Sequence, residues 1–502
     1  MPRRSRAQSL TIPPPVLGWN TKDPLSTMDQ TYAVEVINYF SDGSTVDARK
    51  GYTAYATGIG GGVPVPLLIE FPLQNGTRKF VAVSGGYRPF NISSSGAGVD
   101  LSTGGTFIGG PSGIVFRNRL FIKDNTGVYD VISWDGAAAA FVNAAFTGPG
   151  GDDKLLTNIS VYKNRLYFCG KDLSVWYGGV DAITGALTQF DFQSVFTQGG
   201  FLYFAGPVNK SGDTNQEYFA AISSTGEILI YQGDNPGSAT WGVVGHYYMP
   251  PPCGFKAFFY WGSELVIITF QGVVLLNSVI NARDGDLVFL SDKINSQFVE
   301  LISTAILASD ISGVYYPKGN FLLISMYTLT NSFVQFVMNT ITRSWWRWNG
   351  INAQSWGLYN NDLYFGFYGA SAPTDGRVYK MWDGYTDLNV DTGASQTHSL
   401  KLRPAYNYFD NRSTTKHFTA ANVILKESEG LSLTVDADVD YADTTPTNTV
   451  TDTSDTSYKL YNAKVGLTGI GKAASIRFEQ TVTTKRRSIQ AIEVFFNEGD
   501  IQ

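Results

Sequence analysis

The chain has few cysteines and histidines. Among its 502 residues there are two cysteines, Cys169 and Cys253, and three histidines, His246, His398 and His417. Two cysteines are too few for a disulfide framework, and we expect no disulfide. No histidine has a second histidine, a cysteine or a carboxylate at metal-ligand spacing, so the sequence does not support a zinc site or a Ser-His-Asp triad. We expect isolated histidines in loops or on the surface.

Charged residues are also scarce, at 16% of the chain, whereas glycine (53 residues) and aromatic residues (14%) are abundant. This composition is typical of a β-rich, rigid protein with few surface charges. The 37 basic and 43 acidic residues give a net charge of −6, which argues against a protein that grips nucleic acid by neutralising phosphates. It is compatible with a surface along which DNA slides.

A long apolar run is absent as well. Arg3, Arg4 and Arg6 are followed by a proline-containing segment where a signal peptide needs an apolar run, and no stretch has transmembrane length. We therefore expect a chain that is neither exported by that route nor membrane-spanning. Three consecutive prolines at 13–15 predict an extended arm up to about Val16.

The sequence does contain a repeated phrase: an apolar-aromatic strand, a polar turn and a second apolar strand. It occurs five times, at residues 115–122, 161–168, 261–267, 316–324 and 358–365, with a weaker copy at 218–231 and an early strand pair at 79–92. A period of roughly 40–55 residues with several short strands per unit is typical of a β-propeller. The count predicts six or seven blades within residues 51–395. The alternative is a set of unrelated turns in a large β protein.

A second mark supports the repeat. Three tripeptides of the form Trp-Asp/Asn-Gly close apolar segments, at residues 134–136, 348–350 and 382–384. Asp-Gly and Asn-Gly supply the positive φ of a tight turn, and the preceding tryptophan can cover a neighbouring blade.

Two segments have helical spacing. The apolar residues of 27–40 fall on one face, and Thr27 with Gln30 has the form of a capping box, which predicts one short N-terminal helix. We expect the arm and this helix, residues 1–50, to join the C-terminal domain at residues 396–502, which we call the platform. Residues 298–306 fit a short helix and a buried strand about equally well.

Residues 396–502 have a different texture, in which apolar residues at 431, 433, 435, 437 and 439 alternate with polar ones. The alternation predicts a separate antiparallel β-sandwich, the platform domain. It also puts Asp436, Asp438 and Asp440 on the solvent face. A calcium site is the alternative, but the spacing lacks the glycine and the bidentate glutamate of a calcium loop. The polar segment 444–457 is expected to be a loop.

Two further motifs have ordinary interpretations. The glycines at 58 and 60–62 precede Val-Pro-Val-Pro instead of a helix start, so we interpret them as a flexible connection and not as a phosphate cradle. The basic run Lys485-Arg486-Arg487, with the N-terminal arginines, could contact DNA or an acidic partner, although a solvated turn between strands is favoured.

The N-terminal region carries a family resemblance. The motif is Gly18-Trp19-Asn20-Thr21-Lys22-Asp23-Pro24-Leu25, then Met28, Ala33 and Asn38, and finally Val46-Asp47-Ala48-Arg49-Lys50-Gly51-Tyr52. It resembles the opening of podophage tail nozzle proteins, the tail tubular protein B and packaged-DNA stabilisation families. Trp19 departs from the small or aliphatic residue that is common there.

The resemblance implies a β-propeller followed by a C-terminal β platform. It also implies six copies in a ring below the portal and adaptor, with tail fibres or spikes as further partners. Genomic DNA would pass through the lumen without sequence-specific binding. Trp19, Asn20, Asp23, Pro24 and Arg49 become interface candidates. Because Arg49 is suited to pair with a buried carboxylate or carbonyls, a role inside the monomer is an equal alternative.

The sequence therefore predicts an all-β structural protein of the phage virion tail, made in the host cytoplasm, with no catalytic residue, cofactor or metal. An acidic lumen would repel the DNA backbone. One rival function is a glycan-binding or fibre-docking tail protein. Another is a propeller-type polysaccharide depolymerase, which would need paired carboxylates around its central channel. The Ser-x-Asp-x-Gly-x-x-Trp boxes that sialidase-like enzymes carry are absent.

Overall fold

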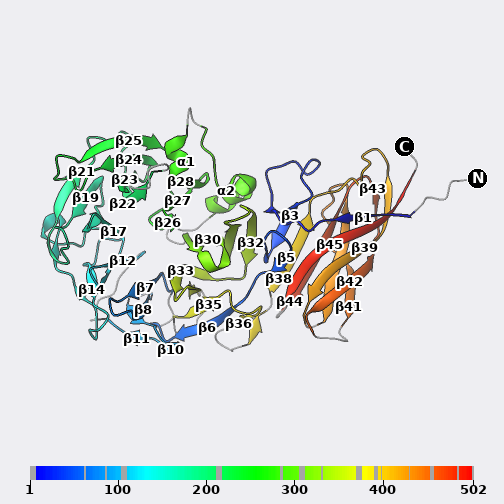
Figure 1. The fold of residues 1–502 in the computed structure, drawn as a ribbon, viewed down its shortest axis with the longest axis horizontal. Helices are drawn as coiled ribbons and strands as arrows, with labels where there is room; N and C mark the ends of the chain where they lie inside the picture. The colour runs from blue at the N-terminus through cyan, green and yellow to red at the C-terminus, as the bar shows by residue number, and fades with distance from the viewer. Residues whose placement is uncertain are drawn as a thin grey trace, which may run out of the picture.

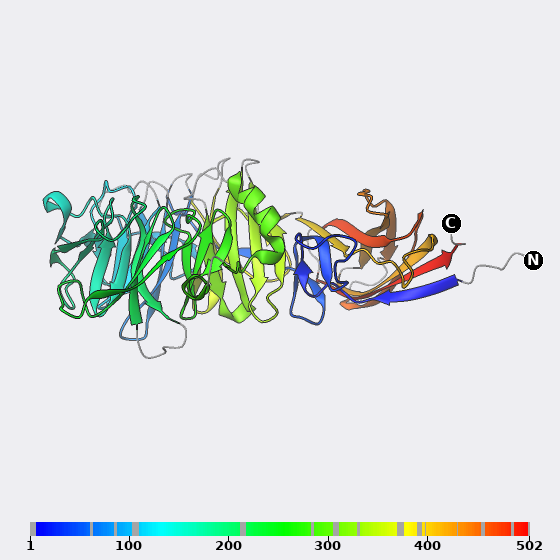
Figure 2. The same cartoon turned by 90° about the horizontal axis from the view of Figure 1, so that it is seen from above.

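A computed structural model describes residues 7–60, 64–84, 88–102, 110–210, 217–282, 286–304, 311–328, 332–368, 376–388, 394–396, 398–428, 430–452, 457–482 and 486–499. The protein is mainly β. Its described α-helices are α1 (Leu276–Asn281) and α2 (Asn295–Ser303). Figure 1 shows a ring of small sheets beside a sandwich, and Figure 2 shows that the ring is a flat disc with the two chain ends at the far end of the sandwich.

Five small antiparallel sheets form propeller blades. The first blade contains β7 (Leu67–Pro72), β8 (Arg78–Val83), β9 (Pro89–Asn91) and β11 (Val99–Asp100), and the second contains β12 (Ser112–Phe116), β13 (Arg119–Lys123), β14 (Ile132–Trp134) and β15 (Val142–Asn143). The third contains β17 (Ile159–Tyr162), β18 (Arg165–Cys169), β19 (Ser174–Tyr177) and β21 (Thr188–Asp191), and the fourth contains β22 (Leu202–Asn209), β23 (Glu217–Ser223), β24 (Glu227–Gln232) and β25 (Gly242–Tyr248). The fifth contains β26 (Phe258–Trp261), β27 (Glu264–Thr269) and β28 (Gly272–Leu275). The short strands β16 (Phe146–Thr147) and β20 (Gly185–Ala186) pair in parallel.

Two further meanders belong to larger sheets. One is β29 (Ser312–Tyr316), β30 (Phe321–Thr328), β31 (Ser332–Asn339) and β32 (Trp345–Asn349); the other is β33 (Ala353–Tyr359), β34 (Asp362–Phe367) and β35 (Val378–Met381), extended by β6 (Tyr52–Thr57), β36 (Asp387–Leu388), β37 (Ser395–Gln396) and β10 (Gly96–Ala97). The inner strands, with the middle strand β27 in one case, contact one another in sequence: β7 with β12, β12 with β17, β17 with β22, β22 with β27, β26 with β29, β29 with β33, and β33 with β7.

The repeated phrase folds as predicted, into hairpins; four of the five copies have two-residue turns, and the copy at 316–324 has a four-residue turn. Both turn residues have positive φ in Arg117-Asn118 (47° and 56°), Lys163-Asn164 (45° and 57°) and Asn360-Asn361 (50° and 63°). Two successive positive φ angles match the twist of the flanking strands. The predicted Trp-x-Gly turns are also confirmed, since Gly136, Gly350 and Gly384 all have positive φ. Trp134 lies 6.0 Å from Phe71 of the neighbouring blade, ring centre to ring centre.

Further sheets lie beside the propeller; two of them face each other, and we call this two-sheet body, which includes N-terminal strands, the sandwich. One sheet contains β4 (Tyr39–Ser41), β5 (Val46–Ala48), β45 (Arg487–Glu498), β39 (Lys416–Glu427) and β42 (Lys459–Gly466), with β1 (Ala7–Ile12) on β45 and β43 (Ile470–Gly471) on β39. The facing sheet contains β3 (Tyr32–Ile37), β38 (His398–Pro404), β44 (Ala474–Val482), β40 (Leu431–Val439) and β41 (Asn448–Asp452).

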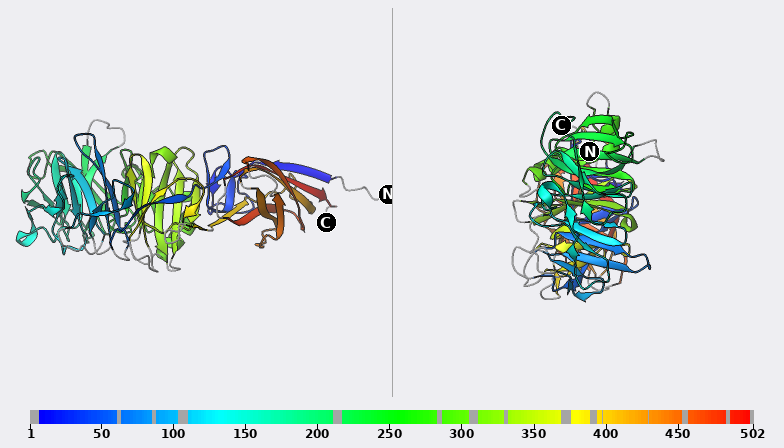
Figure 3. Two further views of the ribbon diagram at one scale, coloured as in Figure 1. Left: turned by 90° about the horizontal axis from the view of Figure 1, so that it is seen from below. Right: turned by 90° about the vertical axis from the view of Figure 1, so that its left-hand side faces the viewer.

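This facing sheet continues into the propeller. Strand β2 (Gly18–Trp19) pairs with β3 on one side and with β32 on the other, so ten strands from β29 to β41 form one sheet. The buried residues of this ten-stranded sheet and those of the other sandwich sheet belong to one apolar core. Figure 1 shows β3 and β5 lying between the disc and the rest of the sandwich, and the side view in Figure 3 shows the same order. Backbone hydrogen bonds therefore connect the two bodies.

The predicted helix at 27–40 is wrong, because β3 and β4 occupy that segment. Its tyrosine, valine and isoleucine side chains suit a strand, and β2 and β38 supply partners on both edges. Gln30, expected in a capping box, donates instead to the carbonyl of Tyr406 at 2.8 Å. The undecided segment from 298 is α2, with Phe298 and Ile302 buried, while residues 305 and 306 lie outside the described part.

Two expectations for the platform need correction. The polar segment 444–457 contains a strand, β41, which pairs with β40, while its residues 453–456 lie outside the described part. Asp438 is not on the solvent face. It is buried at 0% exposure, because its face of β40 is covered: Arg403 lies 3.2 Å away, Arg477 lies 3.7 Å away, and the Thr444 hydroxyl donates to it at 2.7 Å.

A substitution at Gly18 tests the joint between the two bodies. Gly18 has φ of +75°, and an added Cβ would lie 2.3 Å from the carbonyl oxygen of Trp345 in β32. We expect Gly18→Ala to cost about 2–5 kcal/mol, from left-handed strain plus the clash. Chemical denaturation of the full chain measures this cost.

Gly76→Ala is the matched control, because Gly76 also has positive φ (+83°) but has open space around its Cβ position. It should cost only the backbone strain, about 1–2 kcal/mol. Equal costs for the two variants would show that the close approach of β2 to β32 is unimportant.

Candidate functional site

The five residues predicted from the N-terminal motif do not form one surface. Trp19, Asn20 and Arg49 are buried at 5%, 1% and 1% exposure, whereas Asp23 is half-buried and Pro24 is exposed. Trp19 Nε1 donates to the carbonyl of Val34 at 3.1 Å, and its ring stacks on Phe336. The larger side chain at position 19 therefore fills space between the N-terminal strands and β31.

Asn20 organises the turn that follows β2. Its Oδ1 accepts the backbone N–H groups of Lys22 (3.0 Å) and Asp23 (3.1 Å), and its Nδ2 donates to Asp23 Oδ2 at 2.8 Å. Lys293, just before α2, donates to the same carboxylate at 2.9 Å. The hydrogen bonds from Lys293 and Asn20 lower the pKa of Asp23. Asp23 thus holds the motif turn against the region around α2.

Arg49 pairs with a buried carboxylate, as its sequence context suggested. Its guanidinium donates to Asp387 Oδ1 at 2.9 Å and to Asp387 Oδ2, and its Nε donates to Asn38 Oδ1 at 2.9 Å. Asp387 lies on β36 and is 1% exposed. This ion pair binds the end of the N-terminal segment to the strand at the end of the propeller region. Nothing in the sequence marked Asp387 as its partner.

The histidine expectation is only partly correct. His417 is exposed, but His398 is buried with Nδ1 3.9 Å from Asp387 Oδ2, and burial together with Arg49 lowers its pKa to about 4. His246 Nε2 lies 2.6 Å from Glu227 Oε1, and Glu227 also accepts from the backbone of Thr197 and Gln198. No group of three or more histidine, cysteine or acidic side chains is arranged for a metal within the described ranges.

The basic run at 485–487 is not a fully solvated turn. Arg487 is 1% exposed, and its Nη2 lies 2.9 Å from Glu427 Oε1, which is 0% exposed. A buried carboxylate on the adjacent strand β39 accounts for this inward position. Lys485 and the arginines at 3, 4 and 6 lie outside the described residues, as do the glycines at 61 and 62. The two cysteines are free and buried, and burial raises the pKa of Cys169 to about 12.

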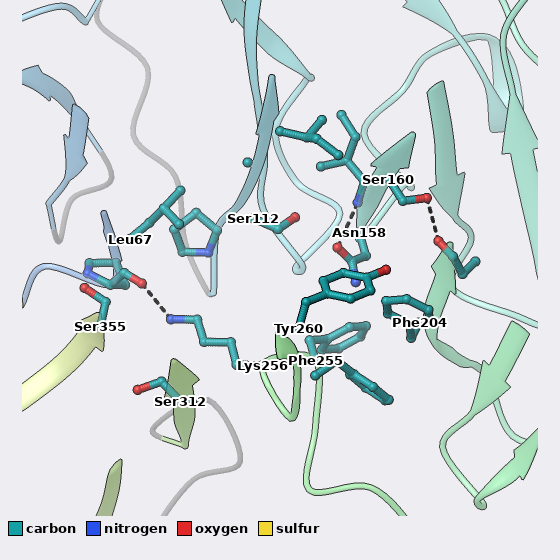
Figure 4. Close-up of a pocket in the computed structure, with 18 of the residues that line it drawn as sticks. Leu67, Ser112, Asn158, Ser160, Phe204, Phe255, Lys256, Tyr260, Ser312 and Ser355 are labelled. Atoms are coloured by element: carbon teal, nitrogen blue, oxygen red, sulfur yellow. Dashed lines mark hydrogen bonds between the residues drawn. The ribbon is translucent and has the colours of Figure 1, made fainter. Parts of the chain in front are cut away.

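A cavity of about 370 Å³ lies at the centre of the propeller. Its lining comes from the inner strand of every blade and meander, among them Leu67, Ser112, Ser160, Phe204, Tyr260, Ser312 and Ser355. Figure 4 shows Lys256 crossing it, with Nζ donating to the carbonyl of Pro66 at 2.8 Å. Among the described lining residues Lys256 is the one charged group and there is no carboxylate. Paired carboxylates for glycosyl transfer are therefore missing from this lining.

A second hollow, of about 720 Å³, lies at the joint between propeller and sandwich, and we call it the joint groove. Its lining includes the motif residues Trp19 to Leu25, the first turn of α2, and several charged side chains: Glu35, Arg347, Arg403, Asp443 and Arg477. Sequence reasoning missed Arg347. The available signal was one charge among three tryptophans in Trp345-Trp346-Arg347-Trp348.

A buried charge cluster lies between the second and third blades. Lys123 and Asp124 are both 0% exposed, and their side chains are 2.5 Å apart. Asp153, 1% exposed, accepts from the backbone of Val131 at 3.2 Å, while its Oδ2 has no hydrogen-bond partner. Burial and the neighbouring Asp130 raise the pKa of Asp153 to about 7.

Comparisons with known proteins give only distant likeness. No family model matches the chain, and no curated protein matches it. Among solved structures, it is similar to Sqt1 of Saccharomyces cerevisiae (TM-score 0.40, 12% identity, 71% of this chain and 96% of that one). It is also similar to the WD40 β-propeller domain of Doa1 (0.38, 12%, 66% and 97%) and to the computationally designed Ika8 protein (0.37, 9%, 65% and 99%). Likeness at this level carries no argument about function.

No helix in the described ranges is both long enough and apolar enough to cross a membrane.

Removing Asp387 tests the buried ion pair. We expect Asp387→Ala to destabilise the full chain by about 3–5 kcal/mol, because it leaves the Arg49 guanidinium buried without a carboxylate. Lys22→Ala is the control, since the Lys22–Asp292 pair is about half exposed and such pairs are worth about 0–1 kcal/mol. Denaturant titration compares the two. A cost for Asp387→Ala no larger than for Lys22→Ala would contradict the assigned role.

The raised pKa of Asp153 gives a pH-dependent prediction. The folded protein keeps the proton up to about pH 7, whereas the unfolded chain loses it near the ordinary pKa of 3.8, so stability from this group falls as the pH rises from about 3.8 to about 7. Asp153→Asn cannot ionise. The melting temperature of the Asp153→Asn variant minus that of the native chain should therefore be larger at pH 8 than at pH 5. A difference that does not change with pH would refute the assignment.

Proposed function

We propose that the chain is a structural protomer of a phage tail nozzle, which forms a ring around the path of the genome. The observation that carries this proposal is where the motif lies. The residues that resemble the nozzle family's opening occupy the joint, where β2 pairs with both the propeller meander and the sandwich. A motif that sets the angle between two bodies suits a scaffold, because the assembly depends on that angle.

We further propose that the two meanders complete a seven-bladed ring. The inner-strand contacts run through all seven units and return from β33 to β7. Strand β6, from the N-terminal part of the chain, pairs with β35 and makes the last unit four-stranded. On this proposal residues 51–395 form the propeller, residues 396–502 form the platform, and residues 1–50 join the platform.

The genome would pass between protomers and not through a propeller. A volume of about 370 Å³ is that of a small-ligand pocket, far below what a DNA duplex needs. The conduit would therefore have to be built by several copies around a shared axis. Six copies with the adaptor above them is the arrangement that the resemblance implies.

The rival functions have less support. A depolymerase needs an acid and a second carboxylate near the scissile bond, and the described lining of the central cavity offers neither. A glycan-binding tail protein fits the aromatic lining of that cavity. It gives no reason, however, for a sheet that runs continuously into the sandwich.

Mass measurement and imaging of the purified assembly test the proposal. We expect a closed ring of six copies of the 54.9 kDa chain. A trimer would point instead to a receptor-binding spike. Release of reducing ends from host polysaccharide would replace the structural role with an enzymatic one.

A further inference from the structure

The joint groove contains one cation, Arg347, without an ion-pair partner among the described residues. Arg347 lies on β32 between two buried tryptophans, Trp346 and Trp348, and its side chain turns away from them toward the groove. Its guanidinium carbon is 5.9 Å from the centre of the Trp19 ring. The Arg347 side chain is therefore part of the groove wall.

The other charged side chains that line the groove are paired. Lys22 lies 2.7 Å from Asp292, and Asp23 lies 2.9 Å from Lys293. On the sandwich side, Glu35 lies 2.8 Å from Arg477. Arg403 has carboxylates at 3.2 Å (Asp438) and 3.3 Å (Asp443).

Arg347 has no such partner within the described part of the chain. No carboxylate lies within ion-pair distance, and its Nε is buried without a hydrogen bond. Burial lowers the pKa of this guanidinium, and Glu35 opposes the shift from a distance. A partly desolvated guanidinium without a partner is costly to keep, so a native chain that keeps one has an unmet need for an anion.

We propose that the joint groove binds a carboxylate group through Arg347. The planar guanidinium fork matches a carboxylate with two parallel hydrogen bonds. A single negative charge is favoured over a higher one, because the neighbouring Arg403 and Arg477 already have three carboxylates within 4.0 Å: Glu35, Asp438 and Asp443. Glu35 and Asp443 on the same walls would repel the higher charge of a phosphate. This inference does not depend on the nozzle function.

The chemistry is shared by two sources, a free carboxylate and an acidic side chain on a neighbouring protein chain. Calorimetric titration of the full chain distinguishes them with four probes: butyrate, the peptide acetyl-Gly-Glu-Gly-amide, its Gln counterpart, and inorganic phosphate. We expect the Glu peptide or butyrate to bind, and the Gln peptide and phosphate to bind at least tenfold more weakly. Tighter binding of the Glu peptide would identify a protein side chain as the source, and tighter binding of butyrate would identify a small molecule.

Substitutions test whether Arg347 is responsible. Arg347→Met should weaken carboxylate binding at least tenfold without lowering the melting temperature, because it removes an unpaired cation. Arg347→Lys keeps the charge but loses the fork, and should also bind more weakly. Arg343→Gln is the matched control, since Arg343 stacks on Trp261 at 4.3 Å and does not line the groove. It should bind as the native chain does.

Several outcomes would overturn the proposal. These are no carboxylate binding by the native chain, equal binding of the Glu and Gln peptides, tighter binding of phosphate, and undiminished binding in both Arg347 variants. If Arg347→Met fails to fold, Arg347→Lys decides the question. Unchanged binding in that variant would then count against a bidentate contact.

Discussion

The two-sided pairing of β2 is the constraint on which the rest of the structure depends. Two residues, Gly18 and Trp19, connect the β29–β32 meander of the propeller to the sandwich sheet through backbone hydrogen bonds. A side-chain interface between two bodies can slide, whereas a shared sheet fixes register as well as distance. The disc and the sandwich therefore have one relative orientation. The buried ion pair between Arg49, just after β5, and Asp387 on β36 reinforces it.

In this arrangement, the N-terminal segment is the last part of the chain that can take up its folded position. Strands β1, β2, β3 and β6 pair with β45, β32, β38 and β35, so their partners lie hundreds of residues away; Arg49 and Asp387 are separated by 338 positions. Contacts at such separation form late, because closing a long loop costs entropy before any contact offsets it. The propeller blades, by contrast, are local hairpins. The fold thus combines locally formed blades with a joint that closes only when the whole chain is present.

The hairpins could be predicted from the sequence because their cause is local. Turn pairs such as Lys163-Asn164 and alternation such as that of 431–437 act over a few residues. The strands in segment 27–40 could not be predicted, because the apolar residues of this segment also fit one face of a helix. The segment forms a strand because β38, which is distant in the sequence, pairs with it. Asp438 and Arg487 were predicted on the surface for the same reason: the oppositely charged side chains that make their burial tolerable, Arg403 and Glu427, come from other strands. Charge pairing across a sheet leaves no mark in sequence spacing.

The joint also explains why an unpaired arginine is tolerable there. A groove between two bodies admits water, so the Arg347 guanidinium keeps part of its hydration while it lies 5.9 Å from the centre of the Trp19 ring. In a blade interior the same charge would need a carboxylate, as Lys123 needs Asp124. An unsatisfied charge therefore costs less at the joint than it would in a blade interior. In the proposed ring, this groove is a place where a carboxylate of a neighbouring protomer could bind, because the joint holds the guanidinium beside Trp19.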